Sequence, residues 1–333
     1  MSTLTVLGAG SWGTALSVHL AREGRTVRLW ARDPQLVERM SATRENVEYL
    51  PGAMLPPGVT PMSALGPALD GTGFVIVAVP SHGVRAVVRA ATPFIASRAI
   101  VVSATKGLEV ETHARMSELI TEETAARFPV VVLSGPSFAA EVARGLPAAV
   151  LAASSDPAAA ARVQEHFRGR ALRLYVSDDV AGVEIGGALK NVIAIAAGAV
   201  DGLGLGHNAM SALITRGLAE ISRLACAEGG RRDTLAGLSG LGDLVLTCTG
   251  DLSRNRHVGL ELGRGRSLSD ILSGMHMVAE GIRTTGAALA LGARHGIELP
   301  ITAQMAEVLE GRSSPAEAVE SLMGRRQRAE VDG

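Results

Sequence analysis

The sequence predicts an α/β fold in which an N-terminal doubly wound parallel-sheet domain is followed by an all-helical C-terminal domain. With 333 residues, the chain is long enough for two domains. Its first half alternates short apolar strands with helices, as in parallel sheets that are covered on both faces. From about Val180 onward, helical periodicity dominates and no convincing strand appears. We therefore expect the sheet domain over 1–179 and the helical domain over 180–333.

The individual elements follow from β-rich apolar runs and from helical spacing. The expected strands lie at 3–7, 26–31, 74–79, 99–103, 129–134, 148–152 and 171–176. Helices are expected between most of them, for example at 12–22, 82–91 and 158–168. The Pro- and Gly-rich stretch 50–61 is expected to be a loop. In the second half, helices are expected at 211–227, 268–272, 284–295, 302–309 and 315–322.

Composition argues against several classes of partner. The 32 basic and 33 acidic residues leave a net charge of −1, so no long-range field attracts nucleic acid or a membrane surface. The longest apolar stretch, 182–200, contains Glu184 and Lys190, which indicates a buried helix and no membrane insertion. The two cysteines lack metal-ligand spacing and no secretory signal is evident, so we expect reduced thiols and a cytoplasmic protein.

A Gly-rich turn links the first strand to the first helix. Gly8, Gly10 and Gly13 form a G-x-G-x-x-G pattern. Such a pattern permits a tight turn, close approach of the backbone to a diphosphate, and close packing of helix on strand. The backbone N–H groups of Ser11 and Trp12 at the helix start would face the anion. The alternative is an ordinary strand-to-helix turn, but the flanking strands favour a Rossmann-type dinucleotide site.

The end of the second strand bears on which dinucleotide is bound. Enzymes that select NAD usually place an acidic residue there to bind the ribose 2′-hydroxyl. This chain has Ala31 followed by Arg32, and an arginine suits a 2′-phosphate. Asp33 could instead pair with Arg32 on the surface or bind the hydroxyl itself. We therefore expect NADPH, with NADH possible.

Polar and glycine residues follow three further strands of the first half. In a doubly wound sheet, these carboxyl ends line the ligand crevice. Turn-rich strand ends are common, so a single loop would carry little weight, but three such loops together favour a binding site. The loops are Val79-Pro80-Ser81-His82, Ser103-Ala104-Thr105-Lys106-Gly107 and Ser134-Gly135-Pro136-Ser137.

Lys190 is the most informative residue of the second half. On a helix, Gly186 and Gly187 lie one turn before it, so its side chain would rise from a surface of small apolar residues. Loss of hydration there lowers the pKa of an amine and permits proton exchange near neutral pH. The alternatives are a lysine that reaches solvent or one that pairs with Glu184.

Asp243 and Thr247 form a second candidate group. They are four residues apart and therefore share one face of a helix. A carboxylate and a hydroxyl on that face could hold Lys190 and a substrate hydroxyl. The alternative is that Asp243 only caps the helix.

A basic segment, Ser253-Arg254-Asn255-Arg256, follows a glycine-containing loop. Arginine forks and amide groups match phosphate oxygens, so this segment together with Lys106 predicts an anion site, although a solvated loop is the alternative. The eight histidines show no zinc-type cluster with cysteine, and neither a G-x-S-x-G elbow nor a P-loop is found. We expect no metal.

Together these blocks resemble the bacterial NAD(P)-dependent glycerol-3-phosphate dehydrogenase family. The match extends from about residue 2 to 324. The blocks within 182–191 and 240–255 are far more specific than the Gly-rich turn. The matching segments are 8–16, 77–81, 105–107, 133–137, 182–191, 201–204, 213–220, 240–247, 253–255 and 280–281.

The resemblance implies roles for individual residues. Lys190 corresponds to the proton-transferring lysine, which Asp243 and Thr247 orient while Lys106 adds positive field. The implied substrate contacts are Lys106, Gly135, Ser137, Lys190, Asp243, Ser253, Arg254 and Asn255. The implied cofactor contacts, beyond the glycines of the turn, are Ser11, Trp12, Arg32, Tyr49, Lys106, Ala139, Arg254, Val278 and Glu280.

The resemblance also implies a reaction. Hydride would pass reversibly between the nicotinamide and C2 of a three-carbon phosphate ester, reducing dihydroxyacetone phosphate to sn-glycerol 3-phosphate for phospholipid synthesis. We expect a homodimer, because helix-rich second domains of such enzymes often dimerise. One alternative is another two-domain NAD(P) dehydrogenase of the 3-hydroxyacid or 6-phosphogluconate type. A second alternative is a non-catalytic NADPH sensor, which would not need Lys190, Asp243 or Arg254.

Overall fold

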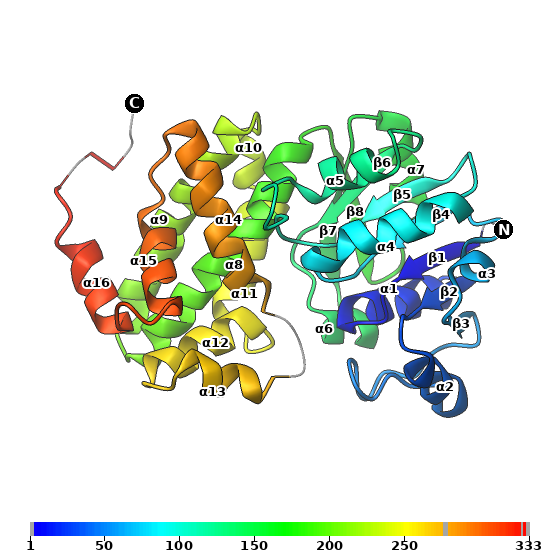
Figure 1. Ribbon diagram of the computed structural model, residues 1–333, viewed down its shortest axis with the longest axis horizontal. Helices are drawn as coiled ribbons and strands as arrows, with labels where there is room; N and C mark the ends of the chain where they lie inside the picture. Colours follow the sequence, from blue (N-terminus) through cyan, green and yellow to red (C-terminus); the bar gives the residue numbers. More distant parts are fainter. Residues whose placement is uncertain (1–2, 276–278, 328, 331–333) are drawn as a thin grey trace.

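A computed structural model describes residues 3–275, 279–327 and 329–330. The described chain folds into the two expected domains, with the sheet domain on the right of Figure 1 and the helical domain on the left. The strand–helix alternation ends with the last strand at Ser177, and the helical domain begins with a long helix at Val180. The predicted fold class is therefore confirmed.

The sheet domain is built from an eight-stranded sheet and seven α-helices among the described residues. Its strands are β1 (Leu4–Leu7), β2 (Val27–Trp30), β3 (Val59–Met62), β4 (Phe74–Val77), β5 (Ile100–Ser103), β6 (Val130–Ser134), β7 (Ala148–Ala153) and β8 (Leu172–Ser177). Its helices are α1 (Ser11–Arg22), α2 (Pro34–Thr43), α3 (Leu65–Leu69), α4 (Val84–Ala91), α5 (Met116–Glu123), α6 (Ala139–Arg144) and α7 (Pro157–Phe167).

The strand order is β3-β2-β1-β4-β5-β6-β7-β8. Successive residues of a strand point to opposite faces of the sheet, and both faces are buried: Phe74 and Ile76 of β4 belong to one core cluster, and Val75 and Val77 to another. This double burial explains why the strands read as continuous apolar runs in the sequence.

Two expectations for the sheet are wrong. The stretch 50–61 is not entirely a loop, because Val59–Met62 forms the edge strand β3. Pro61 is tolerated there because an edge strand does not need every backbone N–H for pairing. The sheet is also not entirely parallel, since β7 runs antiparallel to β6. The chain between β6 and β7 contains the six-residue helix α6, and after it the chain returns in the opposite direction.

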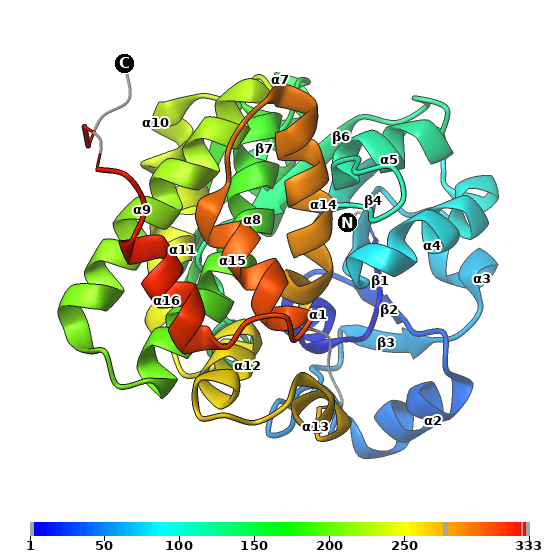
Figure 2. The same cartoon turned by 60° about the vertical axis from the view of Figure 1, so that its left-hand side comes forward.

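The helical domain surrounds one long apolar helix, α8. Figure 2 shows helices of this domain grouped about α8. The helices are α8 (Val180–Gly202), α9 (Gly206–Ala227), α10 (Arg232–Leu235), α11 (Asp243–Thr249), α12 (Arg254–Gly263), α13 (Leu268–Ser273), α14 (Glu280–His295), α15 (Pro300–Leu309) and α16 (Pro315–Met323), with a π-helical turn at Leu238–Gly242. The helices predicted in this half are present, although α9, α14 and α15 begin earlier than expected.

Helix α8 is held closely by α12. A Cβ atom on Gly259 would lie 1.8 Å from the carbonyl oxygen of Ile195, so only glycine allows this approach. Within the described ranges, α8 is the one helix long and apolar enough to cross a membrane, and 89% of its most apolar window is buried inside the protein. The interior position of α8 accounts for its hydropathy, as the sequence predicted.

Candidate active site

The Gly-rich turn has the geometry that a dinucleotide diphosphate requires. Gly8 has φ +117°, a conformation that favours glycine. A Cβ on Gly13 would lie only 1.9 Å from the carbonyl oxygen of Gly8, whereas a Cβ on Gly10 would meet no atom within 4 Å. The space in front of Gly10 is therefore open, and no side chain caps the start of α1. The residues present thus fit a bound diphosphate.

A loop that the sequence analysis did not single out supports this turn. The side chain of Asn46 is fully buried and donates hydrogen bonds to the Ala9 carbonyl oxygen and to Thr14 Oγ1, both at 2.8 Å. Three residues later, the carbonyl oxygen of Tyr49 accepts a 2.7 Å hydrogen bond from Ser11 Oγ. Tyr49 therefore lies beside the turn, and its contact with the cofactor stays a prediction. Only the tertiary contacts reveal Asn46, because it is a polar residue in an irregular loop.

The environment of Arg32 settles one of the open alternatives. Asp33 is the N-cap of α2, accepting a 2.9 Å hydrogen bond from the backbone N–H of Gln35, and it lies 3.8 Å from the guanidinium of Arg39. The structure thus assigns Asp33 to the helix cap, and it shows no ion pair between Asp33 and Arg32 among the described side chains. Arg32 is exposed at the carboxyl end of β2.

Lys190 lies at the centre of the site. Its amine is buried on α8 and donates hydrogen bonds to Asp243 Oδ1 and, at 2.8 Å, to Thr247 Oγ1. The carboxylate and hydroxyl share one face of α11, as their spacing predicted. Asp243 is not the helix cap, which is Gly242. Glu184 does not pair with Lys190 either, because its carboxylate binds other groups.

A second lysine reaches the same carboxylate from the other domain. Lys106 Nζ, on the loop after β5, donates to Asp243 Oδ2 at 2.6 Å and to the Gly135 carbonyl oxygen at 3.0 Å. Ser137 Oγ donates to the same carbonyl oxygen at 2.9 Å. The two lysines, which are 84 residues apart in sequence, therefore bind opposite oxygens of one buried carboxylate.

Burial and the neighbouring charges shift the pKa of Lys190. Burial lowers its pKa from 10.5 to about 7, the Asp243 carboxylate opposes this effect, and the positive charge of Lys106 adds to it. An amine with a pKa near 7 can give up or take a proton at neutral pH. Buried Cys248 is a different case: burial raises the pKa of its thiol to about 12, so it is not a nucleophile and serves as a packing residue.

In the basic segment 253–256, some side chains are hydrogen-bonded within the protein and one is not. Ser253 caps α12, its Oγ accepting from the Arg256 N–H at 3.2 Å. Asn255 is buried, donates to Asn191 Oδ1 at 3.0 Å and accepts from the Gly281 N–H at 2.9 Å. Arg254 is exposed, and its guanidinium makes no hydrogen bond or ion pair within the described residues.

The protein around Arg254 shifts the pKa of its guanidinium. Desolvation by the surrounding protein lowers the pKa of its guanidinium, while the Glu280 carboxylate acts in the opposite direction. Through Asn255 and Asn191, the helix that carries Arg254 is tied to the helix that carries Lys190. Arg254 is thus a cation without a hydrogen-bond or ion-pair partner among the described residues. Its helix is fixed relative to the helix that carries the Lys190 amine.

Of four further residues expected at the cofactor, the structure describes three. Glu280 Oε2 accepts a 2.6 Å hydrogen bond from Ser81 Oγ, and its Oε1 accepts from the Ser81 N–H at 3.1 Å, so α14 is tied to the loop after β4. Trp12 and Ala139 pack against one apolar cluster between α1 and α6. Val278 lies outside the described residues.

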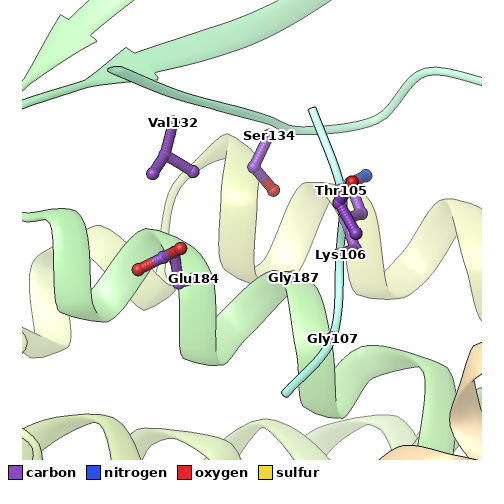
Figure 3. A pocket seen from close by; sticks show the side chains of 7 residues that line it. All are labelled: Thr105, Lys106, Gly107, Val132, Ser134, Glu184 and Gly187. Carbon is purple, nitrogen blue, oxygen red and sulfur yellow. The ribbon is translucent and has the colours of Figure 1, made fainter. Parts of the chain in front are cut away.

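A small cavity of about 10 Å³ lies where the two domains meet. Figure 3 shows Lys106 and Gly107 on the loop that passes Gly187 of α8, with Glu184 one turn earlier on that helix. The Ser134 hydroxyl also lines this cavity and has no hydrogen-bond partner among the residues that the structure describes. In the same described ranges, no group of three His, Cys, Asp or Glu side chains is arranged to hold a metal ion.

A Rossmann-type domain with an open diphosphate turn, joined to a helical domain that supplies a buried lysine, defines a two-domain nicotinamide-dependent dehydrogenase. Comparison with known proteins identifies the family. Residues 3–160 match the family model for the NAD-dependent glycerol-3-phosphate dehydrogenase N-terminus, and residues 179–320 match the model for its C-terminus. The chain belongs to this family of NAD(P)-dependent oxidoreductases, which act on a CH–OH group.

Individual relatives agree with this assignment. The chain is 52% identical to glycerol-3-phosphate dehydrogenase [NAD(P)+] of Koribacter versatilis, covering 99% of each chain. It is 51% identical to the same enzyme of Thioalkalivibrio sulfidiphilus, covering 98% of each. The crystal structure of glycerol-3-phosphate dehydrogenase from Coxiella burnetii superposes with a TM-score of 0.94 at 41% identity, covering 97% of this chain and 99% of that one.

More distant structures share the fold alone. A ketopantoate reductase from Ralstonia eutropha has a TM-score of 0.58 at 18% identity. The family assignment therefore confirms the resemblance on which the sequence analysis relied. It favours that interpretation over both alternatives, a dehydrogenase of the 3-hydroxyacid or 6-phosphogluconate type and a non-catalytic sensor.

Proposed function

We propose that this chain reduces dihydroxyacetone phosphate to sn-glycerol 3-phosphate, that it prefers NADPH while accepting NADH, and that its product feeds phospholipid synthesis. The single observation that carries this proposal is Lys190, a buried amine with a pKa of about 7, held by Asp243 and Thr247. When bound, the nicotinamide cofactor supplies the hydride.

The proton chemistry follows from the geometry of Lys190. An ammonium group has three N–H donors, and Asp243 and Thr247 accept two of those of Lys190. The third is available to the C2 oxygen of the substrate. In reduction, Lys190 gives its proton to this oxygen as negative charge develops on it, and in oxidation the neutral amine removes the proton.

Lys106 and Asp243 fix the electrostatics around this transfer. The Asp243 carboxylate is fully buried and binds both lysine side chains, so it orients both. Lys106 places a second positive charge beside the reacting oxygen. Both lysines therefore stabilise the developing alkoxide.

We assign the substrate phosphate to Arg254, aided by the second amide hydrogen of Asn255 and by the loop of Gly135 and Ser137. An exposed guanidinium that makes no hydrogen bond or ion pair among the described residues suits a dianion. Because the phosphate does not react, its binding energy can hold C2 at hydride distance.

We assign the cofactor diphosphate to the turn of Gly8, Gly10 and Gly13, and the adenosine end to Arg32 and Tyr49. The support for NADPH is that Asp33 is engaged as a helix cap, which leaves Arg32 exposed at the end of β2. Trp12, Ala139 and Glu280 would line the rest of the cofactor site.

The test is NADPH oxidation, followed at 340 nm as absorbance, with dihydroxyacetone phosphate as substrate. The wild type should turn over, and Lys190→Ala should lower kcat by about 100-fold or more while NADPH affinity changes little. Retained turnover in this variant would remove Lys190 from its role. Absence of activity in the wild type would overturn the proposed reaction.

We also propose that the protein is a cytoplasmic homodimer. Both cysteines are free, as expected for a reducing compartment. The helical domain exposes the apolar side chains of Leu241, Val245 and Leu252, a surface suited to a second copy. Light scattering should give twice the chain mass of 34.3 kDa, and a monomer at micromolar concentration would contradict the dimer.

A further inference from the structure

The loop between β5 and α5 belongs to the sheet domain by sequence but is attached to the helical domain. Leu108 of this loop is only 1% exposed, and it is part of the same core cluster as Ile185 and Leu189 of α8. The loop begins with Lys106, which binds Asp243, and it leads into the first turn of α5 at Ser117. Its attachment to α8 therefore bears on where Lys106 is placed.

Glu184 of α8 makes the strongest contact with the far end of this loop. Its Oε1 accepts a hydrogen bond from the Ser117 backbone N–H at 2.8 Å, and its Oε2 accepts from Ser117 Oγ at 2.6 Å. Arg115 Nη1 also donates to Oε2 at 2.9 Å. This buried carboxylate accepts three hydrogen bonds that connect the helical domain to the start of α5. One of them comes from the cationic side chain of Arg115.

The far end of the loop is coupled to the end that carries Lys106. Arg115 and Leu108 form an antiparallel bridge, and the Glu109 N–H donates to the Ala114 carbonyl oxygen at 3.0 Å. The segment between them is therefore a closed turn. Fixing Arg115 fixes Leu108, which is two residues beyond Lys106.

Glu184 does not act on Lys106 by direct contact. Both residues line the 10 Å³ cavity beside Gly187, and no hydrogen bond joins them within the described part of the chain (Figure 3). Lys106 instead donates to Asp243 and Gly135. The hydrogen bonds of Glu184 therefore connect it to Lys106 through the backbone of the loop.

We infer that Glu184 is a positioning residue for the reaction: by holding the loop of 107–117 against α8, it places the Lys106 amine on the Asp243 carboxylate opposite Lys190. This inference rests on the proposed function of the site. It explains why a carboxylate on α8 faces the start of α5 while the catalytic amine lies six residues further along the same helix.

A purely structural role for Glu184 is the competing explanation, and the chain offers a matched control. Glu220 on α9 is also a buried carboxylate that binds the start of a helix. It accepts hydrogen bonds from the N–H groups of Ile301 and Thr302 at 2.8 and 2.9 Å and from Thr302 Oγ1 at 2.6 Å. The contacts resemble those of Glu184, but none involves a catalytic loop.

The experiment is a double-mutant cycle on the full-length protein. Glu184→Gln and Glu184→Ala are each made in the wild type and in Lys106→Ala, and Glu220→Gln is the control. For every variant we measure kcat and KM for dihydroxyacetone phosphate, NADPH affinity by fluorescence titration, and Tm.

We expect Glu184→Ala to lower kcat/KM by about 10- to 100-fold in the wild type, since small misplacements of a catalytic group have effects of that size. In the Lys106→Ala background, the same change should lower kcat/KM by less than about 2-fold, because the amine that Glu184 positions is already absent. Glu184→Gln keeps one acceptor oxygen and should lose less than Glu184→Ala. Glu220→Gln should lower Tm and leave kcat/KM within about 2-fold.

The failure of this inference can be distinguished from the failure of the proposed function. If Glu184 substitutions reduce kcat/KM by the same factor with and without Lys106, the positioning role is wrong even though the enzyme is active. If Glu184→Ala does not fold, the comparison is made with Glu184→Gln alone, and an unchanged kcat/KM in that variant overturns the inference. If the wild type does not reduce dihydroxyacetone phosphate, the proposed function itself fails.

Discussion

Asp243→Asn tests the electrostatics of the site most directly. The pKa of Lys190 is lowered from 10.5 to about 7, first by burial and then by Lys106, while Asp243 opposes both. This fall corresponds to about 5 kcal/mol against the charged amine. An asparagine keeps the shape of the side chain but removes the negative charge that favours protonation of Lys190.

The expected effect is a shift in the pH profile. Loss of a neighbouring opposite charge should lower the pKa of Lys190 by about 1 to 3 units more. Reduction needs the protonated amine, so kcat/KM for dihydroxyacetone phosphate should fall with rising pH through the pKa of Lys190. In the wild type this basic limb should lie near pH 7, and in Asp243→Asn it should move below about pH 6. The rate should also fall, because Lys106 loses its 2.6 Å partner.

The assay is NADPH oxidation measured between about pH 5 and 9. Thr247→Val is the control, since it removes the 2.8 Å hydrogen bond to Lys190 without removing a charge. It should lower the rate while leaving the basic limb close to its wild-type position, and any limb caused by substrate ionisation will appear in both variants. An unmoved limb in Asp243→Asn would refute the assignment of this pH dependence to Lys190.

Four further variants probe ligand binding and the packing of the Gly-rich turn. Arg254→Ala should raise KM for dihydroxyacetone phosphate by at least about 10-fold and leave the KM for unphosphorylated dihydroxyacetone unaffected; an unchanged KM for the phosphate ester would place the anchor elsewhere. Arg32→Ala should weaken the binding of NADPH by about 10-fold more than the binding of NADH. Equal losses of affinity for the two cofactors in isothermal titration would exclude recognition of the 2′-phosphate. Gly10→Ala should keep the wild-type Tm yet weaken NADPH binding, because its Cβ enters open space in front of the turn. Gly13→Ala should lower Tm as well, because its Cβ would lie 1.9 Å from a carbonyl oxygen; similar Tm values for the two variants would contradict this distinction.

The sequence by itself determined the elements whose signal is local. Seven of the strands were predictable because burial on both sheet faces produces continuous apolar runs, such as Phe74–Val77. The Gly-rich turn was predictable because φ +117° at Gly8 and the close approach at Gly13 each require glycine. The shared face of Asp243 and Thr247 followed from helical spacing alone.

Tertiary structure decided the features that depend on residues far away in the sequence. Edge strand β3 contains a proline and forms only because β2 offers it a parallel neighbour. Strand β7 pairs antiparallel with β6, in a sheet whose other pairs are parallel. Local patterns do not record either pairing, because backbone hydrogen bonds between strands are not specific to side chains.

The proposed catalytic centre divides in the same way between local and tertiary information. Lys190 could be recognised as an unusual lysine from its glycine neighbours, but its pKa depends on Asp243 and Lys106, which are 53 and 84 residues away. Asn46 and Glu184 gave no sequence signal for their roles, since a buried carboxylate or amide is identified by the groups that bind it. Residue types and local spacing therefore determined which chemistry was available, and the packing of the two domains decided which groups meet, because electrostatic and hydrogen-bond energies depend on distances that only the folded chain sets.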